Sequence, residues 1–199
     1  MKVLAFVASA FLFASPLFAD AKIGEAAPSF EVKDANGKDQ KLADYKGKWV
    51  VLEWFNKDCP FVKKHYGSQN MQKLQKDFTA KNVVWLTVNS SAKGKQGYAD
   101  ASQALKDASE RGAAPTAILL DADGKVGKAY GAKTTPHMFI INPEQKVVYA
   151  GAIDDNDSSD PKVIEKSKNY VSAALTEGLA GKPITTASSR AYGCGVKYN

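Results

Sequence analysis

The sequence predicts an α/β fold in which helices cover both faces of a mixed central sheet, preceded by an amino-terminal β-hairpin. Apolar runs of strand length alternate with segments whose apolar residues recur every three or four positions. A later pair of apolar runs flanks the turn sequence at 142–145, which adds antiparallel strands to the sheet. The sequence contains no internal repeat or low-complexity tract, so we expect one domain.

The first predicted elements are a hairpin and a buried strand. Residues 29–33 and 38–42 flank Asp34-Ala-Asn-Gly37, and the Asn-Gly pair favours a tight hairpin turn. Residues 49–55 then form an apolar run that only Glu53 interrupts. A continuous run of this kind is typical of a strand covered on both faces.

Two helices and two strands are predicted next. Residues 61–81 have helical spacing, and residues 82–88 and 116–120 are predicted as buried strands. The apolar positions of the first helix are Met71, Leu74 and Phe78. The helix between the two strands should end at Gly112, and its inner face should carry Tyr98, Ala101, Leu105 and Ala108.

The last predicted elements follow a turn at 121–124. A short helical turn is expected at 126–130, and residues 137–141 and 146–153 should form the late hairpin. A final helix should end near Gly181 and Pro183, which favour helix termination. Its apolar face is predicted to carry Ile164, Val171, Leu175 and Leu179.

The amino terminus indicates export. Met1-Lys2, an apolar run at 3–13 and small residues around 19–21 are typical of a secretory signal peptide, too short for a membrane anchor. We expect a signal peptide at 1–21, a domain at 22–180 and a tail at 181–199. No cysteine lies near the cleavage point, so we expect a periplasmic protein without a lipid or membrane anchor.

Charge gives no reason to expect a nucleic-acid or membrane partner. The formal net charge is +6, but the basic residues occur in short clusters such as Lys63-Lys64, without a long basic run. This pattern is typical of a solvated surface.

Cys59 is the strongest candidate for a reactive residue. It lies where the strand at 49–55 gives way to a helix, and Pro60 suits a first helical position. The unpaired N–H groups and the positive dipole end of a helix favour a thiolate there. The alternative is a buried structural cysteine or one half of a structural disulfide.

Cys194 is the second of only two cysteines. A chain of this length needs no disulfide to fold, so two cysteines in an exported protein indicate either one bridge or a redox pair. Cys194 lies between glycines in the tail, and the chain from Gly181 is long enough to reach Cys59. Four states remain open: a resolving cysteine, a permanent disulfide, a free thiol and an intersubunit bridge.

Several of these residues together resemble a known family. Ala27-Pro28-Ser29-Phe30, the strand that ends before Cys59-Pro60, and Thr134-Thr135-Pro136 before an apolar strand resemble the redoxin branch of the thioredoxin-like superfamily. That branch includes peroxiredoxins of the alkyl hydroperoxide reductase and thiol-specific antioxidant type. The resemblance extends over about residues 24–180.

The resemblance implies roles for individual residues. Cys59 corresponds to the nucleophile, and Glu53 corresponds to the buried acid beneath it, a proton acceptor whose pKa burial would raise. Pro136 corresponds to the family's cis-proline, and Thr135 precedes it. This loop faces the cysteine and offers backbone groups to an extended substrate. His137, Asn56 and Pro60 complete the predicted substrate-binding set.

Two departures from the family's patterns limit the reaction. Val62 stands where a Cys-x-x-Cys motif has its second cysteine, so exchange across that turn is impossible. Asn56 stands where a standard peroxiredoxin has a hydroxyl residue, and no proline lies between Trp49 and Cys59. An amide still donates hydrogen bonds to a peroxide oxygen, so peroxidase chemistry is weakened but stays open.

The two histidines and an acidic loop are weaker candidates. His137 is a candidate for proton transfer, whereas we expect His65 to be a bystander. The histidines and cysteines match no zinc spacing, and no close cysteine pair for copper occurs. The loop at 154–160 lacks the glycine and glutamate of a calcium-binding EF-hand. It is expected to be a solvated loop, or to orient the tail through Asp154 or Asp155.

The sequence therefore predicts an exported, peroxiredoxin-like thiol oxidoreductase that needs no cofactor or metal. Cys59 would attack a protein disulfide or a peroxide, Cys194 would resolve the intermediate, and a thiol reductant would restore both. Two alternatives are a true thiol peroxidase and a non-catalytic thioredoxin-fold binding module or metallochaperone. The oligomeric state is left open.

Overall fold

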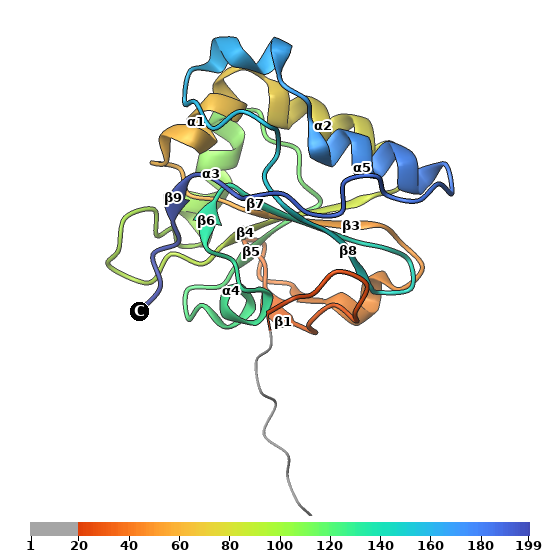
Figure 1. Cartoon of the computed structure of the whole chain (residues 1–199). Coiled ribbons are helices and arrows are strands. Elements are labelled where there is room, and N and C mark those ends of the chain that lie inside the picture. The colour runs from red at the N-terminus through yellow and green to blue at the C-terminus, as the bar shows by residue number, and fades with distance from the viewer. Residues whose placement is uncertain (1–19) are drawn as a thin grey trace, which may run out of the picture.

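The computed structural model describes residues 20–199. The predicted signal peptide lies outside this range except for its last two residues. A mixed five-stranded sheet forms the centre of the molecule, in the order β5-β4-β3-β7-β8 (Figure 1). Its strands are β3 (Val50–Trp54), β4 (Val84–Asn89), β5 (Ala117–Leu120), β7 (His137–Ile141) and β8 (Val147–Gly151). The strand predicted at 49–55 is thus confirmed as β3, and the structure places it at the centre of the sheet.

Strand directions confirm the mixed sheet. The strands β3, β4 and β5 run parallel, whereas β7 is antiparallel to β3 and β8 is antiparallel to β7. The predicted amino-terminal hairpin is also present, formed by β1 (Glu31–Lys33) and β2 (Asp39–Lys41). All five residues of β3 are buried, as expected of a strand that is covered on both faces.

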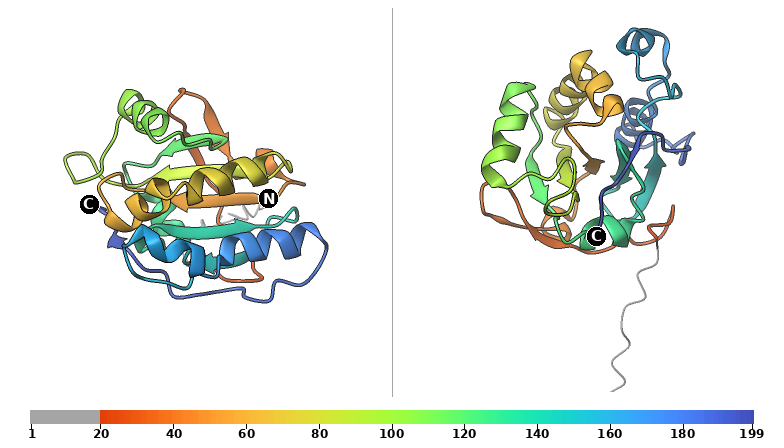
Figure 2. Two further views of the ribbon diagram at one scale, coloured as in Figure 1. Left: turned by 90° about the horizontal axis from the view of Figure 1, so that it is seen from above. Right: turned by 90° about the vertical axis from the view of Figure 1, so that its left-hand side faces the viewer.

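Helices cover both faces of the sheet, as Figures 1 and 2 show. One face carries α1 (Pro60–Gly67), α2 (Asn70–Thr79), α3 (Ala101–Glu110) and α5 (Tyr170–Leu179). The other carries α4 (Lys125–Tyr130), the hairpin and the short helix η1 (Leu42–Tyr45). A second short helix, η2 (Pro161–Lys166), leads toward α5.

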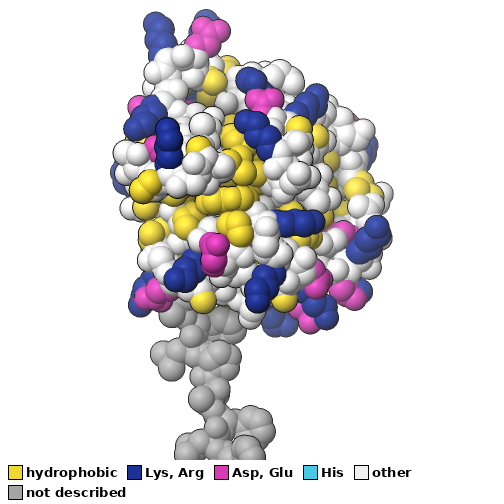
Figure 3. Space-filling model, turned by 90° about the vertical axis from the view of Figure 1, so that its right-hand side faces the viewer, with side chains coloured by type: hydrophobic (Ala, Val, Ile, Leu, Met, Phe, Trp, Pro, Cys, Tyr) yellow, Lys and Arg dark blue, Asp and Glu magenta, His cyan; other side chains and the backbone are white. Residues whose placement is uncertain are grey.

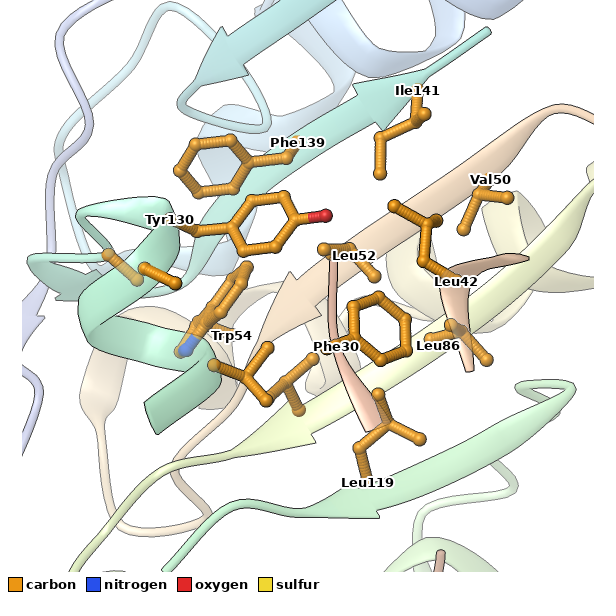
Figure 4. Packing of buried hydrophobic residues seen from close by; sticks show 14 of the residues in the cluster. Phe30, Leu42, Val50, Leu52, Trp54, Leu86, Leu119, Tyr130, Phe139 and Ile141 are labelled. Carbon is orange, nitrogen blue, oxygen red and sulfur yellow. The ribbon is translucent and has the colours of Figure 1, made fainter. Parts of the chain in front are cut away.

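Side chains of β3 alternate between two cores, because successive residues of a strand point to opposite faces. Leu52 and Trp54 belong to the core beneath the sheet, where Trp54 packs against Tyr130 and Phe139 (Figure 4). Glu53 points the other way, toward α1 and α2, where Tyr66 and Gln75 contact it. The strand β3 therefore carries one acidic side chain into the core on the face of α1 and α2.

The predicted helix at 61–81 is two helices. The chain breaks between α1 and α2, where Gln69 takes a left-handed conformation with φ of 62°. Gly67 lowers helix propensity just before the break, and the Ser68 hydroxyl donates to the carbonyl oxygen of His65. Local competition for backbone hydrogen bonds thus ends the first helix.

Two helix faces also differ from the prediction. Leu105 of α3 is 40% exposed, because the smaller Ala104 packs against the sheet and Asp107 turns inward beside Lys57. Ile164 belongs to η2 rather than to the last helix, and Leu179 at the end of α5 is 37% exposed.

The tail contains a short strand near its end. The strand β9 (Cys194–Gly195) pairs antiparallel with β6 (Thr134–Thr135) at the left of Figure 1, away from the face in Figure 3. On that other face, apolar side chains gather at the centre and charges of both signs surround them (Figure 3). Mixed charges there agree with the predicted solvated surface.

Candidate active site

Cys59 lies at the start of α1, as predicted. It is the residue before the first helical turn, Pro60 follows as the first helical residue, and Cys59 is only 1% exposed. The loop from β3 is fixed by Asn56, whose side-chain oxygen accepts from the N–H of Asp58 at 2.9 Å. The N–H of Val62 faces the sulfur and lowers the pKa of its thiol. This is the helix-terminus effect expected from the sequence.

The loop before β7 brings a second group to Cys59. The Thr135–Pro136 peptide bond is cis, which confirms the expectation drawn from the family resemblance. The thiol of Cys59 donates to the carbonyl oxygen of Thr135 at 2.9 Å. Residues 76 positions apart in the sequence therefore meet in one buried site.

The tail carries Cys194 into the same site. Cys194 is the register partner of Thr135, whose hydroxyl donates to the carbonyl oxygen of Cys194 at 3.4 Å. Both cysteines are free thiols, and each shifts the pKa of the other through a side-chain hydrogen bond. The tail thus reaches Cys59, which chain length allowed but did not require.

The two thiols have opposite pKa shifts. Burial alone would raise the pKa of Cys59, but hydrogen bonds from Cys194, from the N–H of Val62 and from the side chain of Thr135 outweigh it, and the pKa lies below its ordinary value. Burial and the neighbouring Cys59 raise the pKa of Cys194 to about 11. Cys59 is therefore the sulfur that ionises first, and Cys194 holds its proton.

Glu53 is buried and accepts four hydrogen bonds. Its pKa is raised by burial, which these bonds only partly offset. The donors are the side chains of Tyr66 (2.7 Å), Gln75 (3.1 Å), Trp85 (2.8 Å) and Thr87 (3.3 Å). Among residues 20–199, no hydrogen bond joins Glu53 to Cys59, so the acid belongs to a neighbouring layer of the same core.

The remaining predicted substrate-binding residues lie around the loops of the site. Pro60 is exposed at the start of α1. The Asn56 amide nitrogen donates to the carbonyl oxygen of Gln96 at 3.3 Å and is thus occupied within the loops. His137 is 9% exposed, and its Nδ1 accepts from the N–H of Lys133 at 3.3 Å.

Sequence reasoning missed a buried polar cluster beside Cys59. Lys64 was expected on the solvated surface, but it is buried and lies 3.2 Å from a carboxylate oxygen of Asp154. His65, expected to be a bystander, donates from Nε2 to the hydroxyl of Tyr192 at 3.0 Å, since Asn70 donates to its Nδ1. We call Lys64, His65, Asp154 and Tyr192 the tyrosine clamp.

The tyrosine clamp attaches the tail to the domain. The Tyr192 hydroxyl donates to Asp154 and accepts from Lys64 at 3.2 Å, in addition to His65. The loop at 154–160 was expected either to be solvated or to orient the tail. For Asp154 the structure supports orientation of the tail, because this side chain is buried. In the sequence, the only signal that the tail docks was an aromatic residue, Tyr192, two positions before Cys194.

Stability should fall as the pH falls from about 6.5 to 4. Burial is the largest cause that lowers the pKa of His65 and His137 to about 4, against an ordinary value of 6.5. The unfolded chain therefore binds more protons in this window, and each extra proton costs about 1.4 kcal/mol per pH unit. Glu53, whose pKa is raised, acts in the opposite direction above its ordinary 4.5.

Urea unfolding of wild type, His65→Gln and His137→Gln between pH 4 and 7 measures this effect. We expect wild type to lose a few kcal/mol and each variant to show a shallower slope. A flat profile in wild type would show that neither imidazole is held neutral.

Residues 20–199 contain no feature typical of a membrane span or a metal centre. No helix in this part of the chain has the length and apolar character needed to cross a membrane. In the same residues, no three His, Cys, Asp or Glu side chains gather closely enough to hold a metal ion.

Comparison with known proteins decides the family. The model of the AhpC/TSA family matches residues 23–150, which include Cys59 and the cis-proline loop. The chain belongs to the AhpC/TSA family. Among curated relatives, the thiol-disulfide oxidoreductase ResA of Bacillus subtilis is 32% identical over 125 residues. That match covers 63% of this chain and 64% of ResA, so this chain spans less than two thirds of that relative.

Solved structures agree on a thioredoxin-like fold. An uncharacterised conserved protein of Geobacillus kaustophilus is 28% identical, with a TM-score of 0.75 over 89% of this chain and 93% of that one. A putative thiol:disulfide interchange protein DsbE of Chlorobium tepidum is 25% identical, with a TM-score of 0.54 over 66% of this chain and 85% of its own. The AhpC/TSA match ends at residue 150 and does not include the tail with Cys194.

Proposed function

We propose that this AhpC/TSA protein is an exported thiol-disulfide oxidoreductase that uses Cys59 and Cys194 of one chain as its redox pair. The observation that carries the proposal is the pairing of β9 with β6, which brings Cys194 against Cys59 at Thr135. The ResA relative has the same reaction in its name. Export is supported by the predicted signal peptide at 1–21.

The first step is attack by Cys59 on a protein disulfide. Its lowered pKa favours the thiolate, which is the nucleophilic form of cysteine. The Cys59 sulfur forms a bond to one substrate sulfur, and the substrate S–S bond breaks. The second substrate sulfur leaves as a thiolate and takes up a proton.

The second step is attack by Cys194 on the mixed disulfide. Cys194 loses its proton and bonds to the Cys59 sulfur, which releases the first substrate sulfur as a thiol. The substrate has then gained two electrons, and the enzyme holds a Cys59–Cys194 disulfide. An external thiol reductant returns the enzyme to the dithiol form. The raised pKa of Cys194 requires a proton acceptor for this step.

Other residues have supporting roles in the proposal. Glu53 is the candidate proton acceptor, supported by its raised pKa and its burial behind α1. Its route to the sulfur would pass through intervening groups. Thr135 and Pro136 would offer backbone groups to an extended substrate, and His137, whose pKa of about 4 keeps it neutral, would line the same loop.

The peroxidase alternative has less support. Both polar groups of the Asn56 amide are hydrogen-bonded within the loops around Asp58 and Gln96. A peroxide oxygen at Cys59 would therefore need another donor. The binding-module alternative does not explain why two thiols with opposite pKa shifts face each other.

Reduction of insulin by the wild-type protein with dithiothreitol tests the function. We expect precipitation of the insulin B chain well above the rate with dithiothreitol alone. An insulin rate equal to the background would overturn the proposal. Thiol-dependent consumption of hydrogen peroxide in the same sample would then assign the protein to the peroxidases instead.

A further inference from the structure

The last residues of the chain are attached to the rest of the domain at several points. After α5 the segment crosses the molecule to β9, as the deep-blue ribbon in Figures 1 and 2 shows. The N–H of Ala150 in β8 donates to the carbonyl oxygen of Ala187, and the hydroxyl of Ser189 accepts from the N–H of Ala152 at 2.9 Å. The Tyr198 hydroxyl donates to the carbonyl oxygen of Ala132 at 2.8 Å.

The tyrosine clamp is the strongest of these attachments. The hydroxyl of Tyr192 makes three hydrogen bonds, and Lys64, His65 and Asp154 are each at most 2% exposed. A buried lysine and aspartate are costly to hold unless they are paired. The Tyr192 hydroxyl accepts from Lys64 and donates to Oδ1 of Asp154, and so supplies one hydrogen bond to each. Release of the tail would remove one hydrogen-bond partner from Lys64 and one from Asp154.

Gly193 lets the tail approach the cis-proline loop. Its φ is 135°, a conformation that other residues rarely adopt, and a Cβ there would lie 2.1 Å from the carbonyl oxygen of Thr135. Gly195, two residues on, has room for a Cβ, since its nearest neighbour would lie 4.0 Å away. The two glycines that flank Cys194 therefore differ in what they tolerate.

We infer that the tail segment 192–195 is a displaceable closure of the active site, held by the tyrosine clamp, which an extended polypeptide substrate must replace at β6. This inference rests on the proposed function and adds that the tail regulates access to the active site. The backbone of Thr134 and Thr135 is already paired with β9 in the closed form. Cys59, 1% exposed, is covered there. The strand β9 thus has two roles: it carries the resolving Cys194, and it competes with the substrate for pairing with β6.

Closure predicts a specific pattern of thiol reactivity. With the tail docked, Cys59 should be alkylated slowly even when fully ionised, because reaction follows the fraction of open molecules. With the tail released, access should increase, while the loss of the hydrogen bonds from Cys194 should raise the pKa of Cys59. Release of the tail should therefore make Cys59 more accessible but less acidic. This combination distinguishes release of the tail from general loosening of the fold.

Iodoacetamide alkylation of the reduced, full-length protein between pH 5 and 10, followed by peptide mapping, tests the inference. We expect Gly193→Ala to increase the limiting rate at Cys59 by about tenfold or more and to raise its apparent pKa. The matched Gly195→Ala variant should behave like wild type. Equal limiting rates in Gly193→Ala and wild type would overturn the inference.

A second pair of variants tests the clamp. Tyr192→Phe removes the hydroxyl that contacts Asp154 and Lys64, whereas Tyr198→Phe removes a hydroxyl that binds one backbone carbonyl. We expect faster alkylation of Cys59 in Tyr192→Phe than in Tyr198→Phe, and the reverse order would contradict the clamp. Alkylation needs no turnover, so loss of insulin reduction with this pattern intact would overturn only the proposed function.

Discussion

Replacing Cys194 by serine should trap the enzyme on its substrate. In Cys194→Ser, the thiolate of Cys59 still attacks a protein disulfide, but no second thiol of the chain can release the mixed disulfide. Turnover on insulin with millimolar reductant should fall roughly 100-fold or more, because a positioned intramolecular group acts at a very high effective concentration. The loss should be accompanied by a covalent adduct.

Mass spectrometry of Cys194→Ser after mixing with insulin measures the adduct. We expect one insulin molecule bound per protein molecule through Cys59, released by dithiothreitol. Cys59→Ser is the matched control, since it makes the same chemical change at the other thiol and should form no adduct. Full turnover in Cys194→Ser would mean that an external thiol resolves the intermediate and that the tail has no chemical role.

Replacing Glu53 by leucine should cause the largest loss of stability. Glu53 accepts hydrogen bonds from four side chains in a buried core, and leucine would leave the indole N–H of Trp85 and the O–H of Tyr66 without an acceptor. Removal of a buried carboxylate can be neutral when its surroundings are apolar, but unpaired buried donors cost about 1–3 kcal/mol each. We expect a loss of about 3 kcal/mol or more, which is near 10 °C in melting temperature for a chain of this size.

Two further variants show whether hydrogen bonding is the cause. Glu53→Gln should lose less, because its amide oxygen can face Trp85 while its NH₂ group donates to the hydroxyl of Tyr66. Glu31→Leu makes the same change on the hairpin, where the Glu31 side chain is 62% exposed, and should change stability by less than about 0.5 kcal/mol. Thermal unfolding followed by circular dichroism ranks the three, and Glu53→Leu as stable as wild type would contradict the expectation.

Local sequence patterns predicted much of the fold and half of the site. The apolar run at 49–55 and Pro60 after Cys59 are local signals, and both elements formed where expected. The cis peptide bond before Pro136 came from the family resemblance, since proline alone does not determine the isomer. The break at Gln69 was missed because a left-handed residue other than glycine has no strong signal in sequence.

The other half of the site depends on contacts between distant residues. Lys64 is buried because Asp154 and Tyr192, 90 and 128 positions away, complete its surroundings. In sequence it is an ordinary lysine beside Lys63. The length of the tail allowed Cys194 to reach Cys59, but the pairing of β9 with β6 depends on a loop formed elsewhere in the chain. Such partners are determined by tertiary packing rather than by local pattern.

The central claim is that Cys59 and Cys194 of one chain form the redox pair. The most direct measurement is peptide mapping, without reduction, of wild-type protein oxidised with diamide and alkylated under denaturing conditions. We expect one disulfide-linked pair of peptides that contain Cys59 and Cys194, from protein that runs as a monomer without reductant. Cysteines that stay alkylatable, or that link only different chains, would contradict the claim.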